Sequence, residues 1–310
     1  MPGFLRSLRH KLQEKIEDGL HQGSSSQSHH NAAPPPQWAP APEASHDYGK
    51  WNEAPEEEYA AAENFCREYP VHAPRLLPSN AVDKITAIGC KAWGIEVPIS
   101  PRFVGTVHND VKAGPAVVTV VTRPECKDIC LLSDLPIIAG LYDIQGKVGV
   151  YYEIYVRRMN GIIALGTACR PYPVWRLPGW NRLSAGFHLD DFRKFFEDPD
   201  GGRDYADTIG RINPGDTVGC GYEFHTGTLF YTYNGQRLGP AFTGIYMPRH
   251  LHDVFAAIGV EGDCEFQVNF GGESFRWLEG NEWSWRVEGH VGRLTGAAGQ
   301  GDEELPTYRR

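Results

Sequence analysis

Short apolar runs separated by glycine and proline fill the chain from about residue 80 onward. In the run at residues 148–156 the side chains alternate, which places Tyr152, Ile154 and Val156 on one face of a strand. About ten runs of this kind predict short strands with hardly any helix between them. They span residues 85–97, 103–107, 116–122, 131–136, 148–156, 162–168, 217–224, 228–233, 254–260 and 265–270. This pattern favours an all-β sandwich.

Two Asn-Gly pairs predict hairpin turns, because both residues tolerate positive φ. Asn234-Gly235 follows the Tyr-rich run at 228–233, and Asn160-Gly161 stands between two other apolar runs. The strands on either side of His225-Thr226-Gly227 are predicted to be consecutive and antiparallel. They form part of the frame of the sandwich, and only the turn between them is placed to touch a partner.

The remaining segments have different patterns and predict different roles. In residues 3–20, apolar side chains recur every four residues and the start is basic, as in a short amphipathic helix. Such a helix can lie on an acidic membrane, dock onto a partner or fold only when covered. Residues 21–79 are rich in Ser and Pro and predict a disordered arm. The sandwich is expected at 80–278, followed by an extension at 279–310 whose Trp283 and Trp285 pack back and whose end frays.

Composition excludes several classes of function. The net charge of the 310 residues is -9 and no basic stripe offsets it, which argues against a nucleic-acid ligand. No apolar run approaches the roughly 20 residues of a transmembrane helix, and no signal peptide is evident. The seven cysteines lack zinc-like spacing and predict buried, reduced thiols in a cytoplasmic protein. No cofactor is expected.

Several motifs occur in the order in which they occur in the SPRY (B30.2) domain, and this chain therefore resembles that family. The motifs are Tyr151-Tyr152-Glu153, Leu177-Pro178-Gly179-Trp180, Ser184 to Asp191, Gly215 to Gly221, Phe230 to Gly235, Leu238-Gly239 and Val268 to Gly271. The resemblance implies a bent, antiparallel, concanavalin A-like β-sandwich with its core at 148–271. It also implies a non-catalytic domain that binds a protein or peptide through loops at one end.

Within the family, the chain is most similar to fungal SPRY proteins of the endosome and vacuole that act as ubiquitin-ligase adaptors, and to Ran-binding protein M. This similarity implies ubiquitin-ligase machinery as a partner and peripheral contact with endosomal or vacuolar membranes through residues 3–20. Three departures stand against it. The fungal adaptors carry a membrane span that has no counterpart here, and their Pro-Pro-x-Tyr motif is matched only by Pro35-Pro36-Gln37-Trp38. Ran-binding protein M continues into helical dimerisation modules, whereas this chain ends soon after its sandwich.

The candidate partner-binding site is the irregular loop system around residues 170–192. Tyr, Trp and Arg are enriched at interface hot spots because they offer a large, rigid contact area with a polar end. The predicted contact residues are Arg170, Tyr172, Trp175, Arg176, Arg182, His188 and Asp190, with His225 from the neighbouring turn. Trp180 and Phe187 are interpreted as core. His188 with Asp190 and Asp191 is also conceivable as a metal cluster, but carboxylates in a turn more often cap backbone N–H groups, and no metal site is predicted.

An enzyme or lectin is the alternative from another class. Glu261, Asp263 and Glu265 stand two residues apart and would share one face of a strand. Paired carboxylates on a concanavalin-like sheet can hydrolyse glycosides. The glycine between them indicates instead a connecting turn in which the carboxylates are solvated.

Overall fold

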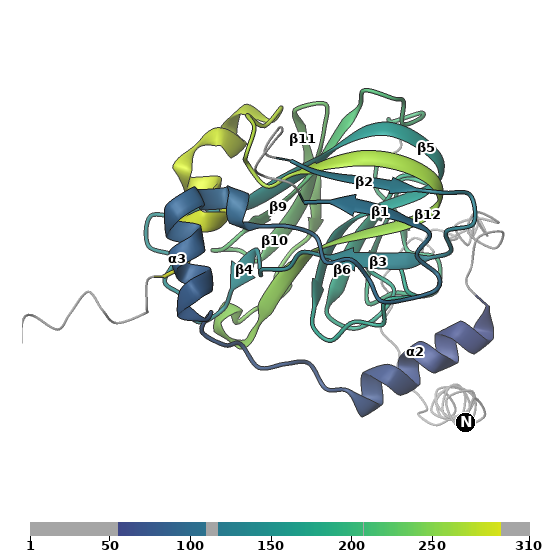
Figure 1. Ribbon diagram of the computed structural model, residues 1–310, viewed down its shortest axis with the longest axis horizontal. Coiled ribbons are helices and arrows are strands. Elements are labelled where there is room, and N and C mark those ends of the chain that lie inside the picture. The colour runs from purple at the N-terminus through teal and green to yellow at the C-terminus, as the bar shows by residue number, and fades with distance from the viewer. Residues whose placement is uncertain (1–54, 110–116, 207, 293–310) are drawn as a thin grey trace, which may run out of the picture. The chain divides into compact units, whose positions relative to one another are not determined.

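A computed structural model describes residues 55–109, 117–206 and 208–292 (Figure 1). Two helices precede the strands in these ranges, α2 (Glu56–Glu68) and α3 (Ser79–Ile88). The strands are β1 (Gly105–His108), β2 (Val118–Thr122), β3 (Ile129–Leu132), β4 (Ile138–Ala139), β5 (Gly149–Cys169), β6 (Ser184–His188), β7 (Arg193–Phe196), β8 (Arg203–Asp204), β9 (Thr217–Glu223), β10 (Thr228–Tyr233), β11 (Gln236–Phe242) and β12 (Asp253–Asn269). Short 3-10 turns occur at η2 (Gly89–Ala92), η3 (Arg249–Leu251), η4 (Leu278–Asn281), η5 (Trp283–Trp285) and η6 (Val287–Gly289).

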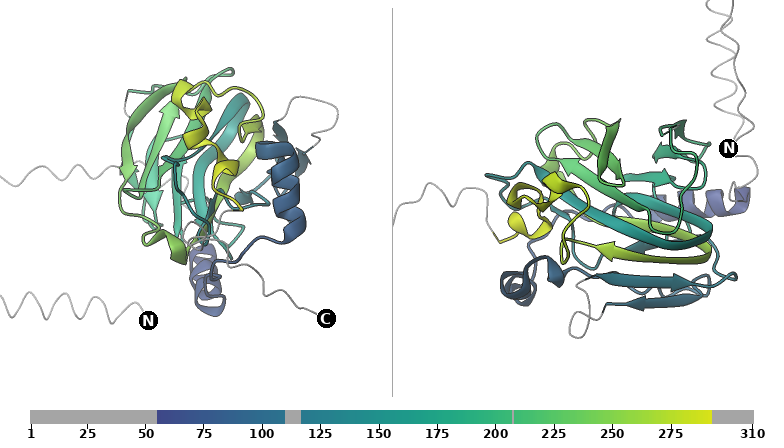
Figure 2. Two further views of the ribbon diagram at one scale, coloured as in Figure 1. Left: turned by 90° about the vertical axis from the view of Figure 1, so that its left-hand side faces the viewer. Right: turned by 90° about the horizontal axis from the view of Figure 1, so that it is seen from above.

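The two long strands β5 and β12 run through both layers of the sandwich. They pair antiparallel from Glu153 opposite Asn269 to Cys169 opposite Val254, and they curve along their length (Figure 2). In the first layer the strand order is β11-β10-β9-β5-β12-β2-β1. In the second layer it is β8-β7-β6-β5-β12, with β3 and β4 on the far side of β12. One continuous antiparallel sheet is thus folded over into the predicted bent β-sandwich.

The fold-over occurs where two glycines face each other. Gly161 pairs with Gly262, which has φ 73°, and a Cβ at Gly161 would collide with the Glu261 carbonyl oxygen. Asn160-Gly161 is therefore part of a continuous strand, and the prediction of a hairpin there is wrong. The prediction at Asn234-Gly235 is confirmed, since both residues have positive φ, 49° and 81°, between β10 and β11.

Helix replaces two segments for which the sequence predicts other structure. The strand predicted at 85–97 is wrong, because Ser79–Ile88 forms α3, which buries Ile85 in the core. The disordered arm predicted at 21–79 is wrong for residues 56–68. There an alanine-rich segment, with three glutamates in its first turn and Arg67 in its last, forms α2 in the orientation that the helix dipole favours. Residues 3–20 and Pro35-Pro36-Gln37-Trp38 lie outside the described residues.

The main core lies between the two layers. Tyr152, Ile154 and Val156 all point into it, as the alternation predicts, and they pack with Phe187 and Phe266 from the neighbouring strands. Six of the seven cysteines are buried, as predicted, and Cys66 is half-buried. No helix in the described ranges is long and apolar enough to cross a membrane.

The outer face of the first layer is covered by the C-terminal segment. Tyr151 and Phe230 point outward from β5 and β10 and pack against Phe275, Trp277 and Trp285. Trp285 packs back as predicted. Trp283 is 56% exposed, and the Lys147 ammonium lies 4.8 Å from the centre of its ring.

The outer face of the second layer is covered by the loop at residues 170–183. Its apolar side chains, including Leu177 and Trp180, pack with Ile162, Ala164 and Phe195 of the sheet. The Cys130 N–H donates to the Val174 carbonyl oxygen at 2.7 Å. The loop lies flat on the sheet, because glycines let its backbone approach closely.

One prediction concerns this close approach. A Cβ at Gly186 would collide with the Pro178 carbonyl oxygen, so Gly186→Ala must push the loop away from the sheet. We expect the free energy of unfolding to fall by roughly 1–3 kcal/mol, as for other overpacked sites, measured by urea denaturation. Gly239→Ala is the control, since nothing lies within 4 Å of a Cβ there. Equal stability of the two variants would contradict the packing.

A second prediction concerns His290, whose side chain is fully buried. Its Nε2 accepts the Ala139 N–H at 3.1 Å, and burial, with Arg249 and Lys147 nearby, lowers its pKa from 6.5 to about 3. A histidine pKa depressed in the folded state favours folding above pH 6.5, and this stabilisation is lost as the pH falls toward 3. At 1.36 kcal/mol per pKa unit, the loss is about 2 kcal/mol at pH 5.

The measurement is the free energy of unfolding at pH 7 and pH 5 for the wild type and for His290→Gln. The difference between the two proteins isolates His290 from Asp128 and Asp191, whose raised pKa values act in the opposite direction. An unchanged difference between the two pH values would show that His290 does not contribute.

Candidate functional site

Hydrogen bonds inside the 170–183 loop hold two of the predicted contact residues. The Tyr172 hydroxyl donates to the Leu177 carbonyl oxygen at 2.6 Å, and Arg176 Nε donates to Asn181 Oδ1 at 3.0 Å. The Arg176 guanidinium also lies 4.4 Å from the centre of the Trp180 ring. Tyr172 is only 4% and Arg176 only 2% exposed. Both side chains take part in the packing of the loop itself, and a contact between them and a partner stays a prediction.

Helix α2 packs on the outside of this loop. The Arg182 guanidinium donates to the carbonyl oxygens of Cys66 and Tyr69 at the end of the helix. Asn181 Nδ2 donates to Glu63 Oε1 at 3.1 Å, and the Phe65 and Trp175 rings meet edge to face at 5.6 Å. The predicted contact residues Trp175 and Arg182 are therefore covered by the chain itself.

The segment after α2 runs along the sandwich and contacts Arg170. The His72 N–H donates to the Arg170 carbonyl oxygen at 2.8 Å. Arg170 Nη2 pairs with Glu96 Oε2 at 2.9 Å, and the guanidinium lies 4.3 Å from the centre of the Phe255 ring. The structure thus places Arg170 in an internal contact.

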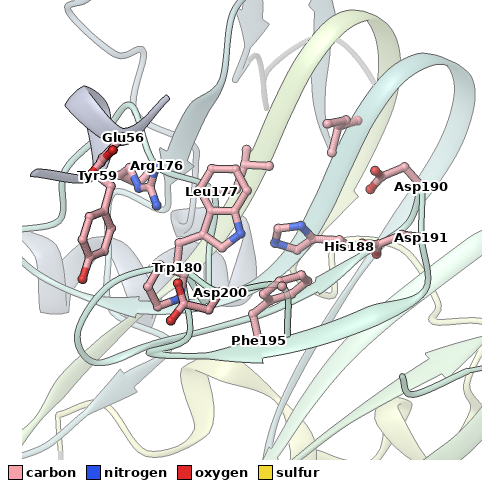
Figure 3. Close-up of a pocket in the computed structure, with 13 residues that line it drawn as sticks. Glu56, Tyr59, Arg176, Leu177, Trp180, His188, Asp190, Asp191, Phe195 and Asp200 are labelled. Carbon is pink, nitrogen blue, oxygen red and sulfur yellow. The ribbon is translucent and has the colours of Figure 1, made fainter. Parts of the chain in front are cut away.

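A pocket of about 340 Å³ opens beside the start of α2 (Figure 3). Five parts of the chain supply its walls: α2, β5, the 170–183 loop, the end of β6 with the turn after it, and the segment from β7 onward. The lining residues are Glu56, Tyr59, Ile162, Arg176, Leu177, Trp180, His188, Asp190, Asp191, Phe195, Pro199, Asp200 and Gly201. The pocket brings together Arg176, His188 and Asp190 from the predicted site.

The middle of the pocket is aromatic. His188 lies between Trp180 and Phe195, with its ring centre 5.6 Å and 4.1 Å from theirs. His188 Nε2 lies 3.0 Å from the Pro178 carbonyl oxygen, and burial lowers the pKa of the imidazole. The ring is therefore neutral near pH 7 and donates its Nε2–H to that carbonyl. Packed in this way, His188 is only 3% exposed and forms part of the pocket wall.

The rim of the pocket is acidic. Asp190 and Asp191 lie together on one side and Glu56 lies on the other (Figure 3). Burial and the neighbouring Asp190 carboxylate raise the pKa of Asp191 to about 6. Asp191 Oδ1 accepts the Arg193 N–H at 3.0 Å, which fixes the turn. A cationic group placed beside Asp191 would stabilise its charged form.

His225 is not among the lining residues of this pocket. The turn that contains it packs against another segment, because the Thr226 and Gly227 carbonyl oxygens accept the N–H groups of Gly244 and Ile245. His225 is exposed, and its role as a contact residue stays a prediction.

The carboxylates of the alternative site lie along β12, not in a connecting turn. Arg158 Nε pairs with Asp263 at 3.0 Å and Arg158 Nη1 pairs with Glu265 at 3.1 Å. This pairing gives both carboxylates a structural partner, and it does not favour the hydrolytic interpretation. Across the described ranges, no three His, Cys, Asp or Glu side chains are grouped so that they could hold a metal ion.

Several pocket residues were not predicted at the site, among them Glu56, Tyr59, Phe195 and Asp200. The first two belong to α2, which begins four residues before the alanine-rich run at Ala60 to Cys66 that indicates a helix. Phe195 and Asp200 carry no local signal, because only the fold brings them beside Trp180.

The chain is similar in sequence to several known proteins. The chain is 29% identical over 259 residues to the protein ssh4 of Sclerotinia sclerotiorum, covering 80% of this chain and 43% of that protein. It is 32% identical over 158 residues to the protein ssh4 of Neurospora crassa, covering 50% and 30%. The SPRY domain-containing protein C285.10c of Schizosaccharomyces pombe is 28% identical over 171 residues, covering 54% and 40%. The chain thus spans less than half the length of these relatives.

Among solved structures, the crystal structure of a human SPRY domain matches 54% of this chain and 96% of its own, with a TM-score of 0.41 and 22% identity. The SPRY domain of human HERC1 matches 49% and 87%, with a TM-score of 0.37 and 10% identity. The family model for the SPRY domain matches residues 149–273, the segment that runs from β5 to just after β12. The predicted resemblance to the SPRY domain is thus confirmed over residues 149–273.

Proposed function

We propose that the chain is a non-catalytic adaptor that captures a short segment of a target protein in the pocket beside α2. SPRY domains are protein-interaction modules, which supports a binding role. The single observation that carries the proposal is the pocket of about 340 Å³ with aromatic walls, which lies in the range of small binding sites.

The chemistry of the pocket suggests which segment it takes. Trp180 and Phe195 offer aromatic faces, and aromatic faces attract cations. Asp190, Asp191 and Asp200 add carboxylates at the rim against a single guanidinium, that of Arg176. A segment with a lysine or arginine side chain would place its charge among these carboxylates and its aliphatic stem against the rings.

The finer role proposed is that of a link between this target and ubiquitin-ligase or membrane-trafficking machinery. The similarity to the ssh4 proteins supports it, together with the resemblance to endosomal and vacuolar adaptors. Pro35-Pro36-Gln37-Trp38 is the candidate ligase contact, and residues 3–20 are the candidate contact with endosomal or vacuolar membranes from the cytoplasmic side.

Charge reversal at the pocket rim tests the capture of a basic segment. A peptide library selected on the immobilised wild-type chain should be enriched in sequences with lysine or arginine. Asp190→Lys with Asp200→Lys should weaken the selected peptides at least tenfold, or about 1.4 kcal/mol, because both changes oppose a cation. The measurement is a fluorescence titration.

The matched control carries Asp83→Lys and Glu125→Lys, which make the same change of charge at two exposed residues outside the pocket. Circular dichroism checks the folding of both variants. Selected peptides without basic residues, or equal binding by the two variants, would contradict the proposed recognition.

Vesicle co-sedimentation of the full chain tests the membrane contact. The wild type should sediment with vesicles that contain phosphatidylserine, and Leu8→Asp with Leu12→Asp should abolish this, because the apolar face of residues 3–20 is interrupted. Equal sedimentation of both proteins would assign the membrane contact to another part of the chain.

A further inference from the structure

Helix α2 is held on the sandwich mainly by polar contacts. Of its 13 residues only Ala62 is buried, while Tyr59 is 39% exposed. Its acidic side chains face basic and polar groups: Glu58 pairs with Arg102 at 2.9 Å, and Glu63 accepts from Asn181. A helix that buries so little apolar surface gains little free energy from docking and is suited to detach.

The surface beneath α2 has the composition of a binding site. We define it as the basic surface, formed by Arg102, Trp175, Asn181 and Arg182, each of which contacts α2 or its last carbonyl oxygens. Arginine and tryptophan are the residues most enriched at interface hot spots. Arg182 holds the C-terminal carbonyl oxygens of α2, where the helix dipole is negative. The basic surface is therefore complementary to the acidic side chains of a helix and to the negative end of its dipole.

The fit between α2 and the sandwich leaves buried polar atoms unsatisfied. Arg176 Nη1 and Arg182 Nε are buried donors that have no hydrogen-bond partner within the described residues. A buried polar atom without a partner destabilises the arrangement that buries it. A helix that supplied these missing partners would bind the same surface more tightly than α2 does.

We infer that the basic surface is a docking site for an acidic helix of a partner protein, and that α2 occupies this site in cis until such a helix displaces it. The observation behind this inference is the placement of Glu58, Glu63 and the helix end against Arg102, Arg182, Asn181 and Trp175. The inference goes beyond the pocket described above. It also bears on that pocket, because α2 supplies Glu56 and Tyr59 to its wall.

Tethering sets the affinity that a partner needs. A covalently attached helix competes at an effective concentration on the order of millimolar. A free acidic helix must therefore bind the basic surface tightly or be delivered by a second contact, such as the pocket. Complementary charge provides specificity, since a basic helix would face Arg102 and Arg182 with unfavourable charge.

The test uses the full chain and a synthetic peptide of residues 55–70 as the probe. Glu58→Lys with Glu63→Lys should release α2 without changing the sandwich, because both residues belong to the helix. Hydrogen–deuterium exchange should show faster exchange of the 56–68 amides in this variant. The labelled peptide, with its own glutamates intact, should then bind the variant at least tenfold more tightly than it binds the wild type.

Two controls make the result specific to charge on the docked face. Glu57→Lys with Glu68→Lys makes the same change at exposed helix residues and should leave both exchange and peptide binding as in the wild type. In the released variant, Arg102→Glu should abolish binding of the peptide, and a peptide with Glu58→Arg should restore it. Restoration by the swapped pair shows that the Arg102→Glu protein is folded.

Two outcomes would overturn the inference. One is a released variant whose 56–68 amides exchange rapidly but which binds the peptide no better than the wild type, so that the surface does not recognise an acidic helix. The other is unchanged protection of 56–68 in the Glu58→Lys, Glu63→Lys protein, so that α2 is a fixed part of the domain. Neither depends on the basic peptides selected at the pocket, so the two proposals can fail separately.

Discussion

The pairing of β5 with β12 is the constraint on which the rest of the structure depends. The two strands remain hydrogen-bonded from Glu153 and Asn269 to Cys169 and Val254, so the chain cannot change layers without bending both together. Gly161 and Gly262 face each other at the bend, where a side chain would strike the partner backbone. Once this bend is set, the halves of each strand supply the centre of both layers, and every other strand adds to one side or the other.

A folded-over sheet has two outer faces as well as an inner core, and this chain covers both. The C-terminal segment packs Trp277 and Trp285 on Tyr151 and Phe230, so that aromatic residues of one layer are buried on the outside. The 170–183 loop does the same for the other layer with Leu177 and Trp180. The loop therefore belongs to the packed structure. The surface available to a partner is formed by the segments that lie on the loop and beside it.

Because the 170–183 loop is part of the packing, partner binding is proposed at the surfaces next to it. The pocket lies where the loop, the turn at Asp190 and Asp191, and the start of α2 meet, and its walls are aromatic while its rim is acidic. The basic surface beneath α2 has the opposite charge. Two adjacent sites of opposite charge allow one target to bind through a basic segment and an acidic helix. Helix α2 contacts both sites. The docked state of α2 would then couple them.

The sequence by itself determined the class of fold and its inner face. Alternation at Tyr152, Ile154 and Val156 places these side chains on one face of a strand, and Asn234-Gly235 closes a hairpin through backbone preferences that act locally. Only the tertiary structure decided that Asn160-Gly161 continues a strand, because that depends on Gly262 about a hundred residues away. It also decided that Tyr172 and Arg176 face inward, and that Glu56 and Tyr59 join Trp180 and His188. Exposure of a loop side chain depends on what the rest of the chain lays over it, and no local pattern encodes that.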